Sequence, residues 1–375
     1  MSKLPHINTS IFSTMSQMAK EYNAINLSQG FPNFPVDERL KNSVAKWAKE
    51  EIHQYLPMAG YPPLLDKIAQ LTLNSYQRKV NPTTEILITA GATQGIFASI
   101  QALVNKDDEV IILDPSYDSY EPTILFCNAK PVRVSLNEDF TPNWETIAKV
   151  FTKKTRMIVV NNPHNPTGKI WTENDFIQLE NLLDLFPDVV LLSDEVYEYI
   201  TFEKKHISAH QRQKLLNKSI CVSSFGKSFH ITGWKIGYLI APESLMIEIK
   251  KAHQFIVFSV NSIAQYAIND YIDWVKVGEL GSFYQQKRDF FRSLMKETKF
   301  ELLPCEGTYF QIASYATFSK ENDLDFAKNL VTNYGVATIP LSPFYGEKND
   351  VKCIRFCFAK DDETLTRAAE RMLKL

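Results

Sequence analysis

The sequence has few of the features that mark secreted or membrane proteins. Its five cysteines are an odd number and form no Cys-x-x-Cys pair, so we expect unpaired, mostly buried thiols and a reducing compartment. No stretch approaches the roughly 20 apolar residues of a membrane-spanning helix. Residues 1–10 also lack the apolar run of a signal peptide. We therefore predict a cytoplasmic protein with no membrane partner, and no metal site is assigned.

An excess of charge of one sign is also missing. The 41 basic and 43 acidic residues give a net charge of −2 and are scattered along the chain. A nucleic-acid-binding face or a patch for an anionic membrane would need clustered basic residues, so neither is expected. The chain has no internal repeat, low-complexity segment or long linker. Because 375 residues are too many for one small core, we expect one large domain and a smaller companion.

Short apolar, β-rich runs alternate with amphipathic stretches between about residues 36 and 245. This alternation is typical of a largely parallel α/β sheet. Several runs are continuously apolar, as expected for strands that are buried on both faces. The sequence predicts an α/β fold in which the large domain, residues 36–272, contains a largely parallel seven-stranded sheet with flanking helices. The predicted strands are 85–90, 109–113, 131–136, 156–160, 189–192, 219–222 and 234–240.

The pattern changes after about residue 272. A long charged helix is expected over 275–298, and a last helix over 362–375. Short strands are expected around residues 309–313 and 354–358. We predict that residues 1–35 and 273–375 together form the smaller domain, of α+β type.

Five of the apolar runs end in polar, glycine or proline residues. In an open α/β sheet, ligands bind outside the carboxyl ends of the strands. A single end of this kind can be a plain turn, but the convergence of five favours one shared site. These ends are Gly91-Ala92-Thr93, Asp114 to Tyr117, Asn161 to Asn165, Ser193-Asp194 and Ser223 to Lys227.

Five segments resemble motifs of the class I, fold-type I pyridoxal-phosphate-dependent aminotransferases. Residues 224–237 resemble the cofactor-lysine segment, and residues 162–168 resemble the Asn-Pro-x-Asn-Pro-Thr-Gly loop. Residues 193–197 resemble the Asp-Glu-x-Tyr turn, and residues 354–358 the C-terminal arginine motif. Residues 26–32 resemble the N-terminal loop of one subgroup, the kynurenine/glutamine and methionine aminotransferases. The motifs stand in the family's order and together span nearly the whole chain.

The resemblance implies that Lys227 carries pyridoxal 5′-phosphate as a Schiff base. Imine formation needs a lysine that can lose its proton near neutral pH. Burial and a second cation nearby, Lys235, would both lower the pKa of Lys227. Without the surrounding motifs, Lys227 would be interpreted as a solvated turn residue.

Three further residues are assigned to the cofactor ring. A buried carboxylate has to keep the pyridine nitrogen protonated, and Asp194, at the end of an apolar run, is expected to supply it. The alternative interpretation of Asp194 is an ordinary turn or helix-cap residue, which is common after strands. Tyr197 and Asn165 are expected to hydrogen-bond the phenolic oxygen of the ring, and Asn165 is also assigned to the substrate. Lys227, Asp194 and Tyr197 are the predicted catalytic residues, whereas Glu195 is expected to point away from the site.

The phosphate of such a cofactor needs backbone donors and positive charge. Gly91-Ala92-Thr93 opens a predicted helix whose N-terminus offers free N–H groups, while Ser224 and Lys235 add a hydroxyl and a charge. Many relatives carry arginine where Lys235 stands, so this position agrees with the kynurenine-type subgroup and departs from the broader family. Tyr117 is expected to stack on the ring. The resemblance alone implies that Tyr55 reaches the phosphate of a neighbouring subunit, which would make the protein an obligate homodimer with shared sites.

Arg355 is the expected anchor for the α-carboxylate of an amino-acid substrate. A guanidinium group matches a carboxylate through two parallel hydrogen bonds, although a structural ion pair is the alternative for Arg355. Gly30 would let the backbone approach the same carboxylate. Phe12, Phe31 and Tyr61 are expected to form an apolar pocket for the substrate side chain.

The resulting prediction is a transaminase that works by a ping-pong mechanism. The expected donors are methionine first, then phenylalanine, tyrosine, glutamine or kynurenine, and the acceptor is a 2-oxo acid. No second arginine that would select a dicarboxylate is evident, and an apolar pocket predicts broad specificity. A cysteine-conjugate β-lyase on the same scaffold is the nearest alternative, and release of pyruvate and ammonia without an amino acceptor would identify it. A cofactor-loaded DNA-binding regulator and a non-catalytic binding protein are less favoured, because there is no added DNA-binding domain and the set of site residues is complete.

Overall fold

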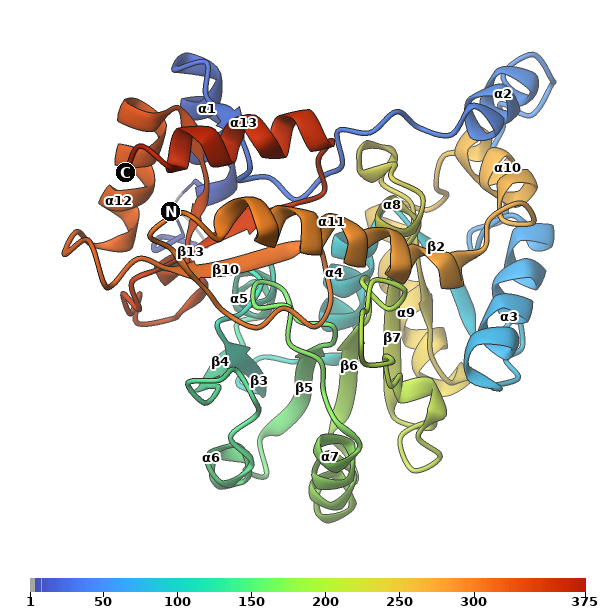
Figure 1. Cartoon of the computed structure of the whole chain (residues 1–375). Coiled ribbons are helices and arrows are strands. Elements are labelled where there is room, and N and C mark those ends of the chain that lie inside the picture. Colours follow the sequence, from blue (N-terminus) through green and yellow to red (C-terminus); the bar gives the residue numbers. More distant parts are fainter. Residues whose placement is uncertain (1–3, 8) are drawn as a thin grey trace.

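The computed structural model describes residues 4–7 and 9–375, and a seven-stranded sheet forms its centre (Figure 1). The strand order is β2-β8-β7-β6-β5-β3-β4. β8 runs antiparallel to both of its neighbours, and every other neighbouring pair is parallel. The predicted largely parallel seven-stranded sheet is confirmed. Its strands are β2 (Ile86–Thr89), β3 (Glu109–Asp114), β4 (Lys130–Ser135), β5 (Thr155–Asn161), β6 (Val190–Asp194), β7 (Ser219–Ser224) and β8 (Gly237–Ile240).

The central strands are buried on both faces because helices cover both sides of the sheet. In β3, Val110 and Ile112 belong to one apolar cluster, whereas Ile111 and Leu113 belong to another, as the two-residue period of a strand requires. The first cluster includes residues of α4 (Ala92–Leu103), α5 (Tyr120–Phe126) and α9 (Glu243–Ile256). The second includes residues of α6 (Trp144–Val150) and α7 (Glu173–Leu185). A third cluster packs α3 (Pro62–Tyr76) and α10 (Ser262–Tyr271) against β2 and β8.

A smaller four-stranded sheet, in the order β12-β13-β10-β9, lies beside the first (Figure 1). The N-terminal segment joins this part of the molecule, because β1 (Ile25–Asn26) pairs in parallel with β11 (Val336–Ala337). The surrounding helices are α1 (Ile11–Glu21), α11 (Leu280–Met295), α12 (Asp323–Tyr334) and α13 (Asp362–Met372). α2 (Glu38–Trp47) lies on the other side of the molecule, where it packs against α10 (Figure 1). The sheet itself is formed by β9 (Glu301–Leu302), β10 (Phe310–Ser314), β12 (Ile339–Pro340) and β13 (Cys353–Cys357).

The expected long helix over 275–298 is shorter in the structure. A 3₁₀ turn at Val277–Glu279 precedes α11, which begins at Leu280 and ends at Met295. The backbone at Gly281 packs closely against Thr201. A Cβ added at position 281 would lie 2.5 Å from the carbonyl oxygen of Thr201. The assignment of residues 36–272 to one domain and of 1–35 with 273–375 to another stays a prediction.

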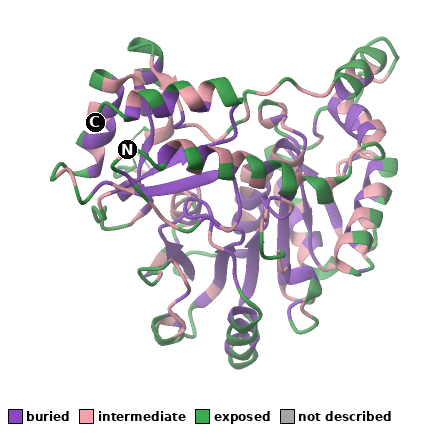
Figure 2. Cartoon of the chain, viewed as in Figure 1, coloured by how far each residue is buried: buried purple, intermediate pink, exposed green. Residues whose placement is uncertain are grey.

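Burial follows this architecture (Figure 2). Apart from the edge strand β4, the strands of the large sheet are almost entirely buried, and the exposed residues lie mainly on the outer helices and connecting loops. All five cysteines are free thiols, and four of them are buried. In the described part of the chain, none of the helices combines the length and apolar character needed to cross a membrane. The cytoplasmic location stays a prediction.

Candidate active site

A cavity of about 320 Å³ lies at the carboxyl ends of the large sheet's parallel strands. It is also bordered by the N-terminal segment and by the smaller sheet, so residues distant in sequence meet there. Except for Tyr55, every residue that was predicted to bind the cofactor or the substrate α-carboxylate lines it. These residues are Gly30, Gly91, Ala92, Thr93, Tyr117, Asn165, Asp194, Tyr197, Ser224, Lys227, Lys235 and Arg355.

Lys227 lies in the short helix α8 (Phe225–Ser228), directly after β7. Its Nζ donates to the hydroxyl oxygen of Tyr309 at 2.9 Å and to the carbonyl oxygen of Gly30 at 3.3 Å. Burial lowers the pKa of Lys227 to about 8, and the charges of Arg355 and Lys235 act in the same direction. The amine is therefore available in neutral form close to physiological pH, as imine chemistry needs.

Asp194 ends β6 and is buried below the cavity. Burial raises the pKa of its carboxyl group to about 6, whereas a hydrogen bond from the Tyr120 hydroxyl opposes this shift. That hydroxyl lies 2.6 Å from Oδ2 of Asp194. The backbone N–H of Val196 donates to the other carboxylate oxygen at 3.3 Å. The carboxylate is thus held in one orientation in a poorly solvated position, where a cationic partner would be strongly attracted.

Arg355 is buried at the centre of β13, with 1% of its surface exposed. One terminal nitrogen donates to Oδ1 of Asn165 at 2.7 Å, and the other donates to the carbonyl oxygen of Ser28 at 3.1 Å. The guanidinium carbon lies 3.8 Å from the ring centre of Phe310 and 5.1 Å from that of Phe12. Among the described residues, no carboxylate forms an ion pair with it. The alternative of a structural ion pair therefore finds no support, and the cation remains available to an anionic ligand.

The N-terminus of α4 forms an anion-binding corner of the cavity. Gly91 has a φ of +78°, which favours glycine, and it starts the helix so that the first N–H groups face the cavity. A Cβ added at Gly91 would lie 3.2 Å from Nζ of Lys235, so the amine of Lys235 borders the same corner. Ser224, at the end of β7, lines the cavity beside them. Backbone dipole, hydroxyl and ammonium together favour a phosphate group.

Two tyrosines contribute rings to the cavity wall. Tyr117 follows β3 and packs edge-on against Tyr120, with the ring centres 5.6 Å apart. Tyr197 follows β6 and packs edge-on against Tyr309 and Phe310. Both residues line the cavity, and their predicted contacts with a cofactor ring stay predictions.

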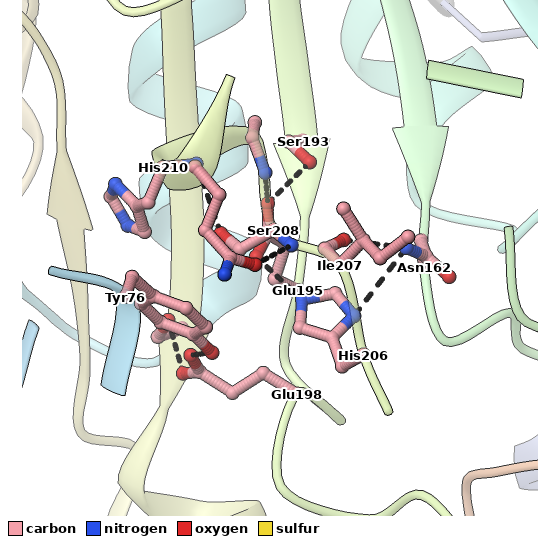
Figure 3. A network of polar contacts seen from close by, with 12 residues as sticks. Tyr76, Asn162, Ser193, Glu195, Glu198, His206, Ile207, Ser208 and His210 are labelled. Carbon is pink, nitrogen blue, oxygen red and sulfur yellow. Dashed lines mark hydrogen bonds and ion pairs between the residues drawn. The ribbon is translucent and has the colours of Figure 1, made fainter. Parts of the chain in front are cut away.

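Glu195 points away from the cavity, as predicted, into a buried polar network (Figure 3). Its carboxylate accepts hydrogen bonds from Oγ of Ser193 at 2.8 Å and from the backbone N–H of Ala209 at 3.0 Å. Nε2 of His206 lies 2.8 Å away. Burial would raise the pKa of Glu195, but the charge and hydrogen bond of His206 lower it to about 2. Because Glu195 follows Asp194 directly, this network fixes the turn that presents Asp194.

Glu198 belongs to the same network and braces two further site residues. Its carboxyl accepts a hydrogen bond from the Tyr76 hydroxyl (Figure 3). It accepts a second one from Oγ of Ser223 at 2.7 Å. Burial raises the pKa of Glu198 to about 7. Glu198 follows Tyr197, and Ser223 precedes Ser224, so one contact behind the cavity links the segments that carry both residues.

Tyr55 lies away from the cavity within its own chain. It is 82% exposed, and its ring packs edge-on against Phe258. Its predicted role in a neighbouring subunit is therefore neither supported nor contradicted by the single chain. Of the three aromatic residues expected in the side-chain pocket, Phe12 lines the cavity. Phe31 instead packs over Nζ of Lys360, and Tyr61 packs against Tyr266, so the pocket formed by one chain does not include them.

Sequence reasoning missed two tyrosines of the site, Tyr120 and Tyr309. Tyr120 stands three residues after Tyr117, a spacing that places both on one side of the turn into α5. Tyr309 follows Gly307-Thr308 directly before β10. A polar aromatic residue beside a strand end was the available signal in both cases, but it does not say which hydroxyl points into a site.

Comparisons with known proteins agree with this geometry. The model of the family "Aminotransferase class I and II" matches residues 22–372. The methionine aminotransferase of Escherichia coli strain K12 is 41% identical, over 100% of this chain and 98% of its own length. The kynurenine–oxoglutarate transaminase of Dictyostelium discoideum is 32% identical, over 98% of this chain and 94% of its own.

Solved structures give the same result. An Escherichia coli protein with an identified methionine aminotransferase function has a TM-score of 0.97 at 41% identity, covering 100% of this chain and 99% of its own. N-succinyldiaminopimelate aminotransferase from Mycobacterium tuberculosis has a TM-score of 0.95 at 30% identity, again covering 100% and 99%.

Proposed function

Because this chain belongs to the class I and II aminotransferases, we propose that it is a pyridoxal-phosphate-dependent transaminase for methionine and other apolar or aromatic amino acids. The observation that carries the proposal is the placement of Lys227, Asp194 and Arg355 around one cavity. A lysine with a lowered pKa, a buried carboxylate and an unpaired buried arginine are the groups that such a reaction needs. The relatives are transaminases by name, so a β-lyase as the main activity is not favoured.

The donor set of the cavity fits the cofactor. Lys227 would hold its aldehyde carbon, Asp194 its pyridine nitrogen, and the corner formed by Gly91, Ser224 and Lys235 its phosphate. Burial that raises the pKa of the Asp194 carboxyl leaves that carboxylate in need of a cationic partner, and a protonated pyridine nitrogen is one. When bound, the cofactor supplies an electron sink for the electron pair left by the departing Cα proton.

The protein's own groups bind the substrate and move its proton. Arg355 receives the α-carboxylate, and its contact with Asn165 fixes the plane of the guanidinium group. The ε-amine of Lys227, when free, would take the proton from Cα of the substrate and hold it for return, because burial lowers the pKa of this amine to about 8. The neighbouring Phe12 and Phe310 exclude water from the arginine.

The walls of the cavity support an apolar substrate side chain. Phe12, Ile96, Val196 and Phe310 line it, and Arg355 is the one arginine among its described lining residues. A dicarboxylic donor would need a second cation to bind its side chain. Methionine is favoured because the relative with 41% identity is a methionine aminotransferase. Broad acceptance of similar apolar donors is expected, since an apolar pocket distinguishes one methylene by only about 10–200-fold.

We further propose that the active form is a homodimer with shared sites. Tyr55 and Phe255 are 82% and 86% exposed, and Ile256 and Phe258 are also exposed. Apolar residues gathered on a surface in this way mark interfaces more often than free surface. A partner chain seated there would receive Tyr55 near its own phosphate corner.

An absorbance spectrum, recorded before and after adding methionine without any oxo acid, tests the proposed function. The expected result is a band of lysine-bound cofactor that decays toward the amine form on addition of methionine. In the variant Lys227→Ala the band should be lost and turnover abolished, while cofactor still binds.

Lys250→Ala is the matched control, because Lys250 is also half-buried with a pKa lowered by burial but lies on α9 outside the cavity. A lysine-bound band that another amino acid shifts and methionine does not would correct the substrate. Normal turnover by Lys227→Ala would refute the mechanism.

A further inference from the structure

The hydroxyl of Tyr309 contacts Lys227 and Gly30, two residues that line the cavity, and the proposed chemistry leaves this hydroxyl without a role. Tyr309 is fully buried, and its ring packs against those of Tyr197, Tyr284 and Phe310. Its backbone carbonyl accepts from the N–H of Phe358 at 3.0 Å, which ties it to the strand that carries Arg355. Ring and backbone are thus fixed by packing, so the hydroxyl has a defined position relative to Lys227.

The hydrogen bonds around this hydroxyl have a fixed direction. Its oxygen lies 2.8 Å from the carbonyl oxygen of Gly30 and 2.9 Å from Nζ of Lys227. A phenol has one hydrogen, and the Gly30 carbonyl can only accept, so the hydroxyl donates to Gly30. It therefore offers a lone pair to Lys227 and receives an N–H from it.

The consequence for the amine of Lys227 follows from its valence. A neutral amine has two N–H bonds and one lone pair. One N–H is directed to Tyr309, and the other is within reach of the Gly30 carbonyl at 3.3 Å. The lone pair then remains free and points away from both acceptors. We propose that Tyr309 is a positioning residue for Lys227, whose hydroxyl holds the free ε-amine by an N–H so that its lone pair faces the reacting atoms.

Gly30 supplies the second acceptor, because its carbonyl oxygen accepts hydrogen bonds from both Tyr309 and Lys227. A Cβ at position 30 would lie 2.7 Å from the ring of Phe310 and 3.4 Å from that of Tyr309. Glycine is therefore required for the carbonyl to approach the tyrosine hydroxyl this closely. These contacts also join the N-terminal segment to Lys227.

The hydroxyl also affects the charge state of the amine. Burial lowers the pKa of Lys227. A hydrogen-bond acceptor stabilises the ammonium more than the amine, so the Tyr309 oxygen at 2.9 Å should act in the opposite direction. In the described part of the chain, Tyr309 and Gly30 are the groups within hydrogen-bond distance of Nζ. The other titratable groups that face Lys227 are Asp194 on β6, Tyr197 after it, Lys235 before β8, and Arg355 and Cys357 on β13.

The variant Tyr309→Phe tests this role in the full chain freed of cofactor. Competitive acetylation of the lysines, followed by mass spectrometry of the Lys227 peptide across a pH series, gives the pKa of that amine. Loss of the acceptor should lower the midpoint by about one pH unit, since a hydrogen bond to a charged group contributes about 1.5–3 kcal/mol and one unit corresponds to 1.36 kcal/mol. Tyr284→Phe is the matched control. Its hydroxyl is buried in the same group of rings but has no hydrogen-bond partner among the described residues.

A midpoint in Tyr309→Phe that equals the wild-type value would overturn the proposal, and so would an equal shift in Tyr284→Phe. Thermal unfolding of both variants shows whether either has lost packing. A second readout rests on the proposed function. In the loaded enzyme, kcat for methionine should fall about 10–100-fold with little change in KM, because the base is misplaced and binding is not. The isotope effect of α-deuterated methionine should rise at the same time. The labelling experiment needs neither cofactor nor methionine. It would therefore still test the role of Tyr309 if the proposed function were wrong.

Discussion

At the scale of single residues, the site depends on side chains that hold other side chains. Asp194 is kept in orientation by Tyr120 and by the backbone N–H of Val196. Its pKa is raised by burial to about 6, and the Tyr120 hydrogen bond is the largest influence in the opposite direction. The carboxylate that is meant to pair with a protonated ring nitrogen therefore stays ionised at neutral pH partly because of Tyr120.

The variant Tyr120→Phe should shift the acid limb of the activity profile. Without the hydroxyl, the pKa of Asp194 rises further, so a larger fraction is protonated at pH 6–7 and cannot pair with the ring nitrogen. We expect the acid limb of kcat/KM to move upward by about one pH unit, with activity largely recovered above pH 8. Tyr199→Phe is the control, since its hydroxyl contacts Ser75 at 3.3 Å outside the cavity. Superimposable pH profiles for Tyr120→Phe and wild type would show that Asp194 does not depend on this bond.

Several of the site residues were predicted because they stand in family motifs. Asp194, Asn165 and Arg355 belong to segments whose order and spacing resemble a known family, and the structure brings them to one cavity. Tyr120 and Tyr309 act through hydroxyl groups whose direction is set by tertiary packing. Sequence spacing predicts that a tyrosine is near a strand end, but not which of several acceptors its hydroxyl reaches.

At the scale of elements, the strand runs were predictable because burial on both faces leaves a continuous apolar signal. The start of α11 was not predicted. A 3₁₀ turn at Val277–Glu279 precedes it, and Gly281 packs closely against Thr201, which is 80 residues away in sequence. A similar close contact between backbone segments lies beside the predicted phosphate site formed by Gly91, Ser224 and Lys235. Gly237, the first residue of β8, lies between the end of β7 and the start of α4.

The variant Gly237→Ala should weaken cofactor binding and stability together. A Cβ there would lie 2.7 Å from the carbonyl oxygen of Ser223 and 2.8 Å from the backbone nitrogen of Ala92, and both neighbours are backbone atoms that cannot rotate away. We expect a loss of about 1–3 kcal/mol in the free energy of unfolding, because the strand and helix must separate. Cofactor affinity, measured by fluorescence titration, should fall because the N–H groups of α4 are displaced. Gly233→Ala is the control, since nothing lies within 4 Å of its Cβ position. Equal cofactor affinities for the two variants would contradict this account of the corner.

At the scale of the whole molecule, one chain supplies a nearly complete site but leaves Tyr55 outside it. Tyr55, Ile256, Phe258 and Phe255 together present exposed apolar surface near the end of α9. A single sequence cannot show whether such a surface is covered, because the signal is the same apolar residue type that fills the core. The proposed dimer explains both the exposed surface and the isolation of Tyr55.

The variant Phe255→Asp should separate the two chains. Phe255 is 86% exposed in the single chain, so replacing it leaves the fold intact, but a carboxylate buried in an apolar interface without a partner is costly. We expect the dissociation constant of the dimer to rise about 30-fold or more, as for an interface residue that contributes at least about 2 kcal/mol. Size-exclusion chromatography with light scattering measures this, and activity per chain should fall as the monomer forms, because each site then lacks the partner's tyrosine. Leu185→Asp makes the same change at a 76% exposed position on α7 and should stay dimeric and active. If Phe255→Asp remained a fully active dimer, the interface would have to lie elsewhere, and the role of Tyr55 would fall with it.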